Sequence, residues 1–273
     1  MAKIPENVAT TGYLLNTGQT TQKPRPYLGM SQNGDPCDRK LWLGFHWAVS
    51  KQIPKRIMRI FRTGNDAEAK IIDDLEQIGI EVSNQQAKIE GFAGHEFGHI
   101  DGECVGVPEA PKTVHLLEMK THNDRSFKQL VKQGVKLAKP MHYAQCMRYM
   151  GGRNLTRALY VAINKNDETY HVERIKFNQG YYDELVKRGR DIILAEQPPG
   201  LMFARTWYEC KWCDFHNLCH QDGEVQRNCR TCAHSDMLDD GVWECGLSST
   251  QLPDVEQRIG CAKWRDGVDL GNS

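Results

Sequence analysis

The chain has 273 residues, of which 40% are hydrophobic and 26% are charged, with 35 basic and 35 acidic side chains. The apolar fraction excludes a disordered chain, and the length allows one large domain or two small ones. Zero net charge excludes a uniformly basic nucleic-acid coat but not a local basic groove. No run approaches the roughly 18 apolar residues of a membrane span, and the first residues lack the apolar core of a secretory signal. We therefore expect a cytoplasmic protein with no membrane partner.

Ten cysteines stand out in this composition, and they are unevenly distributed. Three are isolated in the first part of the chain, whereas the others follow residue 209. Because no export signal is visible, metal ligation is favoured over disulfide formation. This distribution predicts a folded body followed by a metal-stabilised tail.

The first predicted elements are an arm and two helices. Residues 1–34 are polar with little periodicity, which predicts a loosely packed arm. Asp35 and Pro36 are typical of a helix start, and they would place Cys37 in the first turn, where the helix dipole favours a thiolate. A second helix is expected over 63–78. Glu68 continues the apolar stripe of that helix and should face the body of the protein.

Strands and helices then alternate along the chain. Strands are predicted over 97–107, 114–121, 158–163 and 169–177, with the last two forming a hairpin. Helices are predicted over 126–138, 140–150 and 179–196. This order indicates an α/β core with a mixed sheet flanked by helices.

A cluster of charged residues lies on two of these strands. Glu118 and Lys120 point to the same face of one strand, and a neighbouring strand bearing Asp101 can place a second carboxylate beside Glu118. Two clustered carboxylates repel each other unless a cation lies between them, and their hard oxygens suit Mg²⁺ or Mn²⁺. With a lysine beside them, this arrangement suits phosphodiester hydrolysis. The alternative is a surface ion pair on an exposed strand.

At this point the sequence resembles the PD-(D/E)XK nuclease superfamily, with Asp101, Glu118 and Lys120 as its D…ExK triplet. The resemblance covers about residues 35–220 and implies a restriction-endonuclease-like fold. It also implies catalysis by these three residues, with metal held by Asp101 and Glu118.

Two further motifs resemble the RecB-like branch, which includes phage exonucleases and the iron–sulfur nucleases of CRISPR adaptation. Glu68, four residues after Gly64, is similar to an upstream element whose acid helps to hold the metal. Gln145 and Tyr149 are similar to the branch's Q-x-x-x-Y motif and could contact DNA, although such a pair on a helix is often ordinary packing.

The C-terminal cysteines predict two metal sites. Cys210, Cys213 and Cys219 have a tight chelating spacing, and the resemblance implies that Cys37 joins them around a 4Fe–4S cluster. In the remaining tail, residues 221–273, four thiolates in a core-poor segment predict a zinc site. These four are Cys229, Cys232, Cys245 and Cys261. A rival partition is a zinc site made of Cys210, Cys213, Cys229 and Cys232.

The sequence thus predicts a Mg²⁺- or Mn²⁺-dependent DNA exonuclease that acts in end processing or recombination and is encoded by a phage, in which case it works in the host cytoplasm. A single-strand annealing or recombination protein and further copies of the chain are candidate partners. The alternative is a non-catalytic, metal-stabilised module that binds DNA or a protein partner. A thiol redox protein is weaker, because nothing resembling a thioredoxin unit surrounds the C-x2-C pairs.

Overall fold

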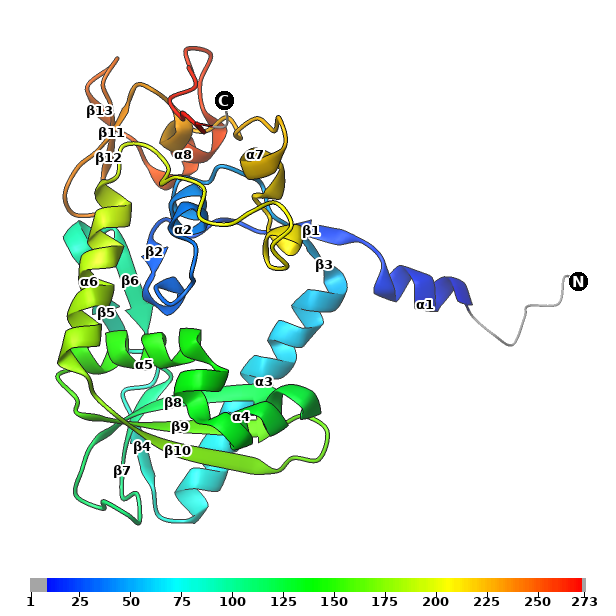
Figure 1. Ribbon diagram of the computed structural model, residues 1–273, viewed down its shortest axis with the longest axis vertical. Coiled ribbons are helices and arrows are strands. Elements are labelled where there is room, and N and C mark those ends of the chain that lie inside the picture. Colours follow the sequence, from blue (N-terminus) through cyan, green and yellow to red (C-terminus); the bar gives the residue numbers. More distant parts are fainter. Residues whose placement is uncertain (1–8, 272–273) are drawn as a thin grey trace, which may run out of the picture.

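A five-stranded mixed sheet, the central sheet, lies in the lower part of the computed structural model, which describes residues 9–271 (Figure 1). Its strand order is β10–β9–β8–β7–β4, and only β8 and β9 are parallel. These strands are β4 (Glu81–Ser83), β7 (Gly102–Val105), β8 (His115–His122), β9 (Arg157–Asn164) and β10 (Tyr170–Lys176). The predicted mixed α/β fold is confirmed, and the predicted hairpin is formed by β9 and β10.

Helices cover both faces of this sheet because its two central strands are apolar on both sides. On one face, Leu117 and Met119 of β8 pack with Ile71 and Leu75 of α3 (Lys55–Gln77). On the other face, Leu116 lies in a core formed by α4 (Asp124–Ala138), α5 (Pro140–Gly152) and α6 (Gln179–Leu194). No helix within residues 9–271 is long and apolar enough to cross a membrane.

The helix expected over 63–78 begins eight residues earlier, at Lys55. The apolar stripe marks only the half that packs on the sheet. Its first half exposes Met58, Ile60 and Phe61 and makes no apolar seam, so periodicity could not detect it.

The strand expected over 97–107 is two strands in different sheets. β6 (Glu96–His99) pairs with β2 (Leu28–Gly29) and β5 (Lys88–Glu90), whereas β7 belongs to the central sheet. Asp101 therefore lies in the link between two strands rather than within one strand. The chain changes sheets here, which a continuous β-like pattern does not reveal.

The helix expected to begin at Pro36, with Asp35 as its N-cap, begins two residues later, as α2 (Asp38–Phe45). The Asp35 carboxylate accepts a hydrogen bond from the Cys37 amide at 3.0 Å and pairs with Lys40, so Cys37 becomes the N-cap. Burial raises the pKa of the Cys37 thiol, although a hydrogen bond from the backbone amide of Lys40 lowers it. Cys37 was expected in the first turn with its thiolate favoured. It is instead the N-cap, and its raised pKa favours the thiol.

The segment before α2 is only partly an arm. Residues 1–8 of the predicted arm lie outside the described residues. Helix α1 (Ala9–Asn16) extends away from the body, and β1 (Gln19–Thr21) pairs with β3 (Gln52–Pro54) (Figure 1). By contrast, Leu28 and Met30 are buried in the core.

The tail packs against the beginning of the chain. α7 (His216–His220) precedes the tail, which contains β11 (Ser235–Met237), β12 (Trp243–Cys245), β13 (Thr250–Gln251) and α8 (Asp254–Ile259). Phe215, Leu218 and Trp243 share a hydrophobic cluster with Trp42 and Phe45 of α2. The two ends of the described chain therefore stabilise each other.

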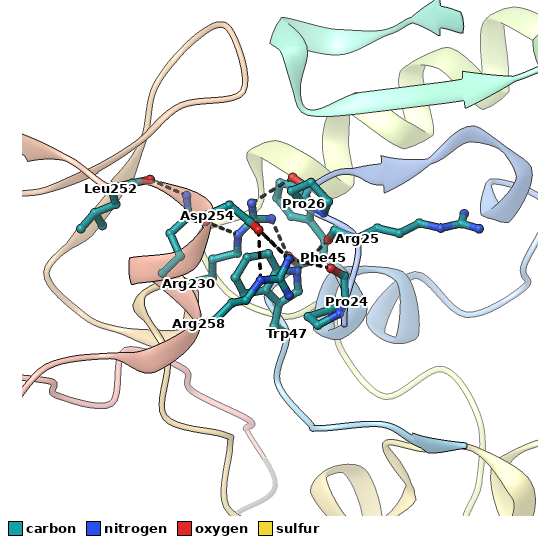
Figure 2. A network of polar contacts seen from close by, with 10 residues as sticks. Pro24, Arg25, Pro26, Phe45, Trp47, Arg230, Leu252, Asp254 and Arg258 are labelled. Atoms are coloured by element: carbon teal, nitrogen blue, oxygen red, sulfur yellow. Dashed lines mark hydrogen bonds and ion pairs between the residues drawn. The ribbon is translucent and has the colours of Figure 1, made fainter. Parts of the chain in front are cut away.

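Arg230 is the polar centre of this contact (Figure 2). Its guanidinium donates to the carbonyls of Pro26 at 2.9 Å and Phe45 at 3.0 Å, and to Oε1 of Gln257 at 2.8 Å. It also lies 4.0 Å from the centre of the Trp47 ring. Nearby, Arg258 donates to the carbonyl of Pro24 at 3.0 Å.

Acidification is expected to destabilise this region through His46. Burial lowers the pKa of His46 to about 3, a hydrogen bond with the Trp42 carbonyl raises it, and the Arg230 charge lowers it further. The folded state therefore holds His46 neutral, while the unfolded chain takes up a proton below its ordinary pKa of 6.5. Stability from this group is complete above pH 6.5 and is lost as the pH falls towards 3, at up to about 1.4 kcal/mol per pH unit.

Urea unfolding at pH 7 and pH 5 measures this effect. His46→Gln should lose less stability on acidification than the wild type. The exposed His99→Gln serves as the control and should follow the wild type. An equal loss in all three proteins would exclude His46 as the source.

Candidate active site

Three of the residues singled out from the sequence lie together on β8 and in the link that precedes β7. Nζ of Lys120 forms an ion pair with Oε1 of Glu118 and lies 3.8 Å from Oδ2 of Asp101. Strand periodicity places Glu118 and Lys120 on one face of β8. Oδ2 of Asp101 accepts a hydrogen bond from the Met119 amide at 2.7 Å, which fixes its carboxylate against β8.

Glu118 is the unusual member of this group because its side chain is completely buried (0% exposed). Apart from the ion pair with Lys120, neither carboxylate oxygen has a hydrogen-bond partner within the described residues. Burial raises the pKa of Glu118 to about 8, with the Lys120 charge lowering it and the Asp101 charge raising it. A buried carboxylate with an unpartnered oxygen is costly to the fold, which is typical of a functional site.

Lys120 remains protonated in these surroundings. Burial opposes its charge, but the Glu118 and Asp101 carboxylates outweigh burial and raise the pKa of Lys120. Glu68 approaches from α3, and burial followed by the Asp101 charge raises the pKa of Glu68. Three carboxylates and one ammonium therefore interact electrostatically at the place where α3 crosses β8.

This group could hold a divalent cation by its chemistry. No set of three or more His, Cys, Asp or Glu side chains between residues 9 and 271 already has metal-binding geometry. The donor set nevertheless fits, since carboxylate oxygens are the ligands that Mg²⁺ and Mn²⁺ prefer and Oε2 of Glu118 has no partner among the described residues. Asp101, Glu118 and Glu68 are the residues that would hold it.

A cleft of about 560 Å³ opens beside these residues. α3 forms one wall, β8 forms the floor, and α4, α5 and the turn after β9 form the opposite wall. The residues that matter below are Ile60, Phe61, Gly64, Glu68, Lys120, Lys139 and Lys165. Glu68 and Lys120 thus face a space that a nucleotide-sized ligand could enter.

A polar network behind Lys120 was not anticipated from the sequence. The Tyr160 hydroxyl contacts Nδ1 of His142 at 2.7 Å and Nε2 of His122 at 3.1 Å. Lys139 Nζ donates to Oγ of Ser126 at 2.7 Å, and that oxygen also contacts His122. Tyr160 lies within an apolar strand and His142 at the start of a helix, so no local pattern could reveal the network.

Gln145 and Tyr149 lie outside the lining of this cleft. Both are buried on α5, with exposures of 8% and 3%. The Tyr149 ring packs on Gly98, where an added Cβ would come within 2.4 Å of Cε1 of Tyr149. Contact of Gln145 and Tyr149 with DNA stays a prediction.

Eight of the ten cysteines form two groups in space. Cys37, Cys210, Cys213 and Cys219 line one small cavity of about 30 Å³. In the tail, burial first and then the neighbouring thiols Cys232, Cys261 and Cys245 raise the pKa of Cys229 to about 11. β12 ends at Cys245, whose pKa is lowered by hydrogen bonds from Ser248 and Leu247.

Comparisons with known proteins show similarity of fold. No protein-family model matches the chain, and no curated protein matches its sequence. An alkaline exonuclease (LHK-Exo) from Laribacter hongkongensis has a similar structure, with a TM-score of 0.47 and 16% identity over 62% of this chain and 87% of that chain. SSO0001 has a TM-score of 0.45 and 15% identity over 74% of this chain and 90% of its own. The structure of LHK-Exo in complex with dAMP has a TM-score of 0.44 and 14% identity over 62% of this chain and 86% of that chain.

Proposed function

We propose that the chain is a divalent-metal-dependent DNA nuclease of the PD-(D/E)XK kind that acts as an exonuclease. The observation that carries this proposal is the buried Glu118 carboxylate, whose Oε2 has no partner among the described residues, beside Asp101 and beside Lys120, which lines an open cleft. A surface ion pair would need none of this burial. Lys88 and Glu90 form such an exposed pair in β5, at the same two-residue spacing.

Each residue has a role in this reaction. Asp101 and Glu118, with Glu68, would hold a Mg²⁺ or Mn²⁺ ion, which would supply charge stabilisation for the phosphate and activate the attacking water. Lys120 donates a hydrogen bond to that water and offsets the phosphate charge. Because its raised pKa keeps it protonated, Lys120 orients the water and does not act as the general base. Gln145 and Tyr149 guide the DNA strand in the family-based proposal.

The test is degradation of end-labelled linear DNA by purified protein with Mg²⁺, with Mn²⁺ and with EDTA. A covalently closed circle of the same sequence is the matched control, because an exonuclease needs an end. We expect loss of linear DNA only with a divalent ion, and an intact circle. Undigested linear DNA under all conditions would contradict the proposal, and binding without cleavage would favour the non-catalytic DNA-binding module.

The cysteine groups support a second part of the proposal. Cys37, Cys210, Cys213 and Cys219 would hold a 4Fe–4S cluster that closes the nuclease domain, residues 35–220. In the tail, residues 221–273, the other four cysteines would hold zinc. The common cavity of the first group and the mutual influence of the tail thiols support this partition over the rival.

Metal analysis of anaerobically purified protein tests the partition. We expect a brown protein with about four irons and one zinc per chain. Cys219→Ser should lower iron and leave zinc unchanged, whereas Cys245→Ser should do the reverse. A wild-type protein that contains zinc but no iron, and that loses its zinc in both Cys229→Ser and Cys210→Ser, would favour the rival zinc site.

The setting of the reaction completes the proposal. We propose that the reaction serves DNA end processing or recombination. The protein would be encoded by a phage and would act in the host cytoplasm. Its partners would be a single-strand annealing or recombination protein or further copies of the chain.

A further inference from the structure

One wall of the cleft carries apolar side chains and the opposite wall carries lysines. Ile60 and Phe61 line the cleft from α3, and 49% of the Phe61 side chain is exposed. Lys139 and Lys165 line it from the other side. Within residues 9–271 neither lysine forms an ion pair, whereas Lys128 on the outer face of α4 pairs with Asp124 at 2.8 Å.

Gly64 lies on the same wall, in the middle of α3. A glycine inside a helix destabilises it relative to alanine. No packing explains this cost, because a Cβ at Gly64 would meet no atom within 4 Å. The fold could therefore accept a side chain at Gly64. The glycine keeps this part of the cleft open.

These residues form a path towards the catalytic group. Ile60, Gly64 and Glu68 are four residues apart and share one face of α3. At 1.5 Å per residue, the path from Ile60 to Glu68 is about 12 Å long. That length spans about three nucleotides at the 3.4 Å spacing of stacked bases.

We propose that this cleft binds one unpaired DNA strand, with its bases against Ile60 and Phe61 and its phosphates towards Lys139 and Lys165. A duplex exposes phosphates on its outside and keeps its base faces stacked within, so it would offer nothing to the apolar wall. Gly64 leaves room for the strand to pass close to the α3 backbone. This inference rests on the proposed function and specifies its substrate as single-stranded DNA.

Fluorescence anisotropy in EDTA tests the inference without hydrolysis. The probes are a labelled 20-nucleotide oligothymidylate and a labelled blunt DNA hairpin. Wild-type protein should bind the oligothymidylate more tightly than the hairpin. Phe61→Ala should weaken oligothymidylate binding by about tenfold, whereas Met58→Ala, an exposed α3 residue outside the cleft, should not change it.

Two further variants separate the roles of space and charge. Gly64→Leu should raise the melting temperature and yet weaken oligothymidylate binding. Lys139→Gln should reduce the slope of log affinity against log salt by about 0.7, and the exposed Lys132→Gln should leave the slope unchanged.

Tighter binding of the hairpin, or wild-type affinity for oligothymidylate in both Phe61→Ala and Gly64→Leu, would overturn the inference. Because binding is measured in EDTA, such a result would leave metal-dependent hydrolysis unaffected. Conversely, absence of hydrolysis would contradict the proposed function while the strand preference still stood.

Discussion

Lys120→Ala is expected to lower the rate of linear DNA hydrolysis by about 10²–10⁴-fold. The variant removes the ammonium that contacts Glu118 and faces Asp101, so the attacking water and the phosphate would lose their positive partner. Burial already raises the pKa of Glu118, and without Lys120 its carboxylate would hold a proton even more strongly. A gel or fluorescence assay with end-labelled DNA measures the rate.

Lys88→Ala is the matched control for this experiment. Lys88 also sits in a strand two residues from its acidic partner, but its pair with Glu90 is exposed at the surface. This variant should hydrolyse DNA like the wild type. Circular dichroism should show that both variants are folded. Hydrolysis by Lys120→Ala at the wild-type rate would remove Lys120 from the catalytic group.

Arg230→Met is expected to have the largest effect on stability. Arg230 is 4% exposed, and the variant would leave the buried carbonyl of Phe45 and the partly buried carbonyl of Pro26 without this donor. It would also remove the stacking of a cation on Trp47. Together these losses should lower the free energy of unfolding by about 3–5 kcal/mol, measured in urea.

Arg258→Met tests whether burial is the reason. Arg258 also donates to a carbonyl of the N-terminal segment and lies 4.5 Å from the centre of the Trp47 ring, but it is more exposed and its ion pair is with Asp254 in the same helix. It should lose only about 1 kcal/mol. Limited proteolysis should cut Arg230→Met first between residues 220 and 228, where the tail leaves the body. Equal losses in the two variants would show that Arg230 is not the main link.

The parts of the fold predictable from sequence are those with strong local periodicity. The β9–β10 hairpin, the helices α4 to α6 and the shared face of Glu118 and Lys120 all follow from periods of two or 3.6 residues. Asp101 could be linked to Glu118 because it lies beside a neighbouring strand. The resemblance to a nuclease family depended on these same residues.

The remaining features depend on contacts between distant segments. The first half of α3 has no packed stripe, so its helical state and its place beside the cleft were not visible. The break after His99 occurs where the chain leaves one sheet for another. Tyr160 and Arg230 look in the sequence like an ordinary apolar-strand residue and an ordinary surface charge. Only the tertiary fold gives Tyr160 two histidine partners and buries Arg230 against three rings.

Calorimetric titration with Mn²⁺ tests the central claim, the convergence of Asp101 and Glu118 on a divalent ion, most directly. Mn²⁺ prefers carboxylate oxygens, so the thiols of the cysteine groups should compete little for it. The wild type should bind Mn²⁺, and Glu118→Gln should bind it about tenfold or more weakly. The exposed Glu90→Gln should match the wild type. Equal Mn²⁺ affinity of the wild type and Glu118→Gln would contradict the account.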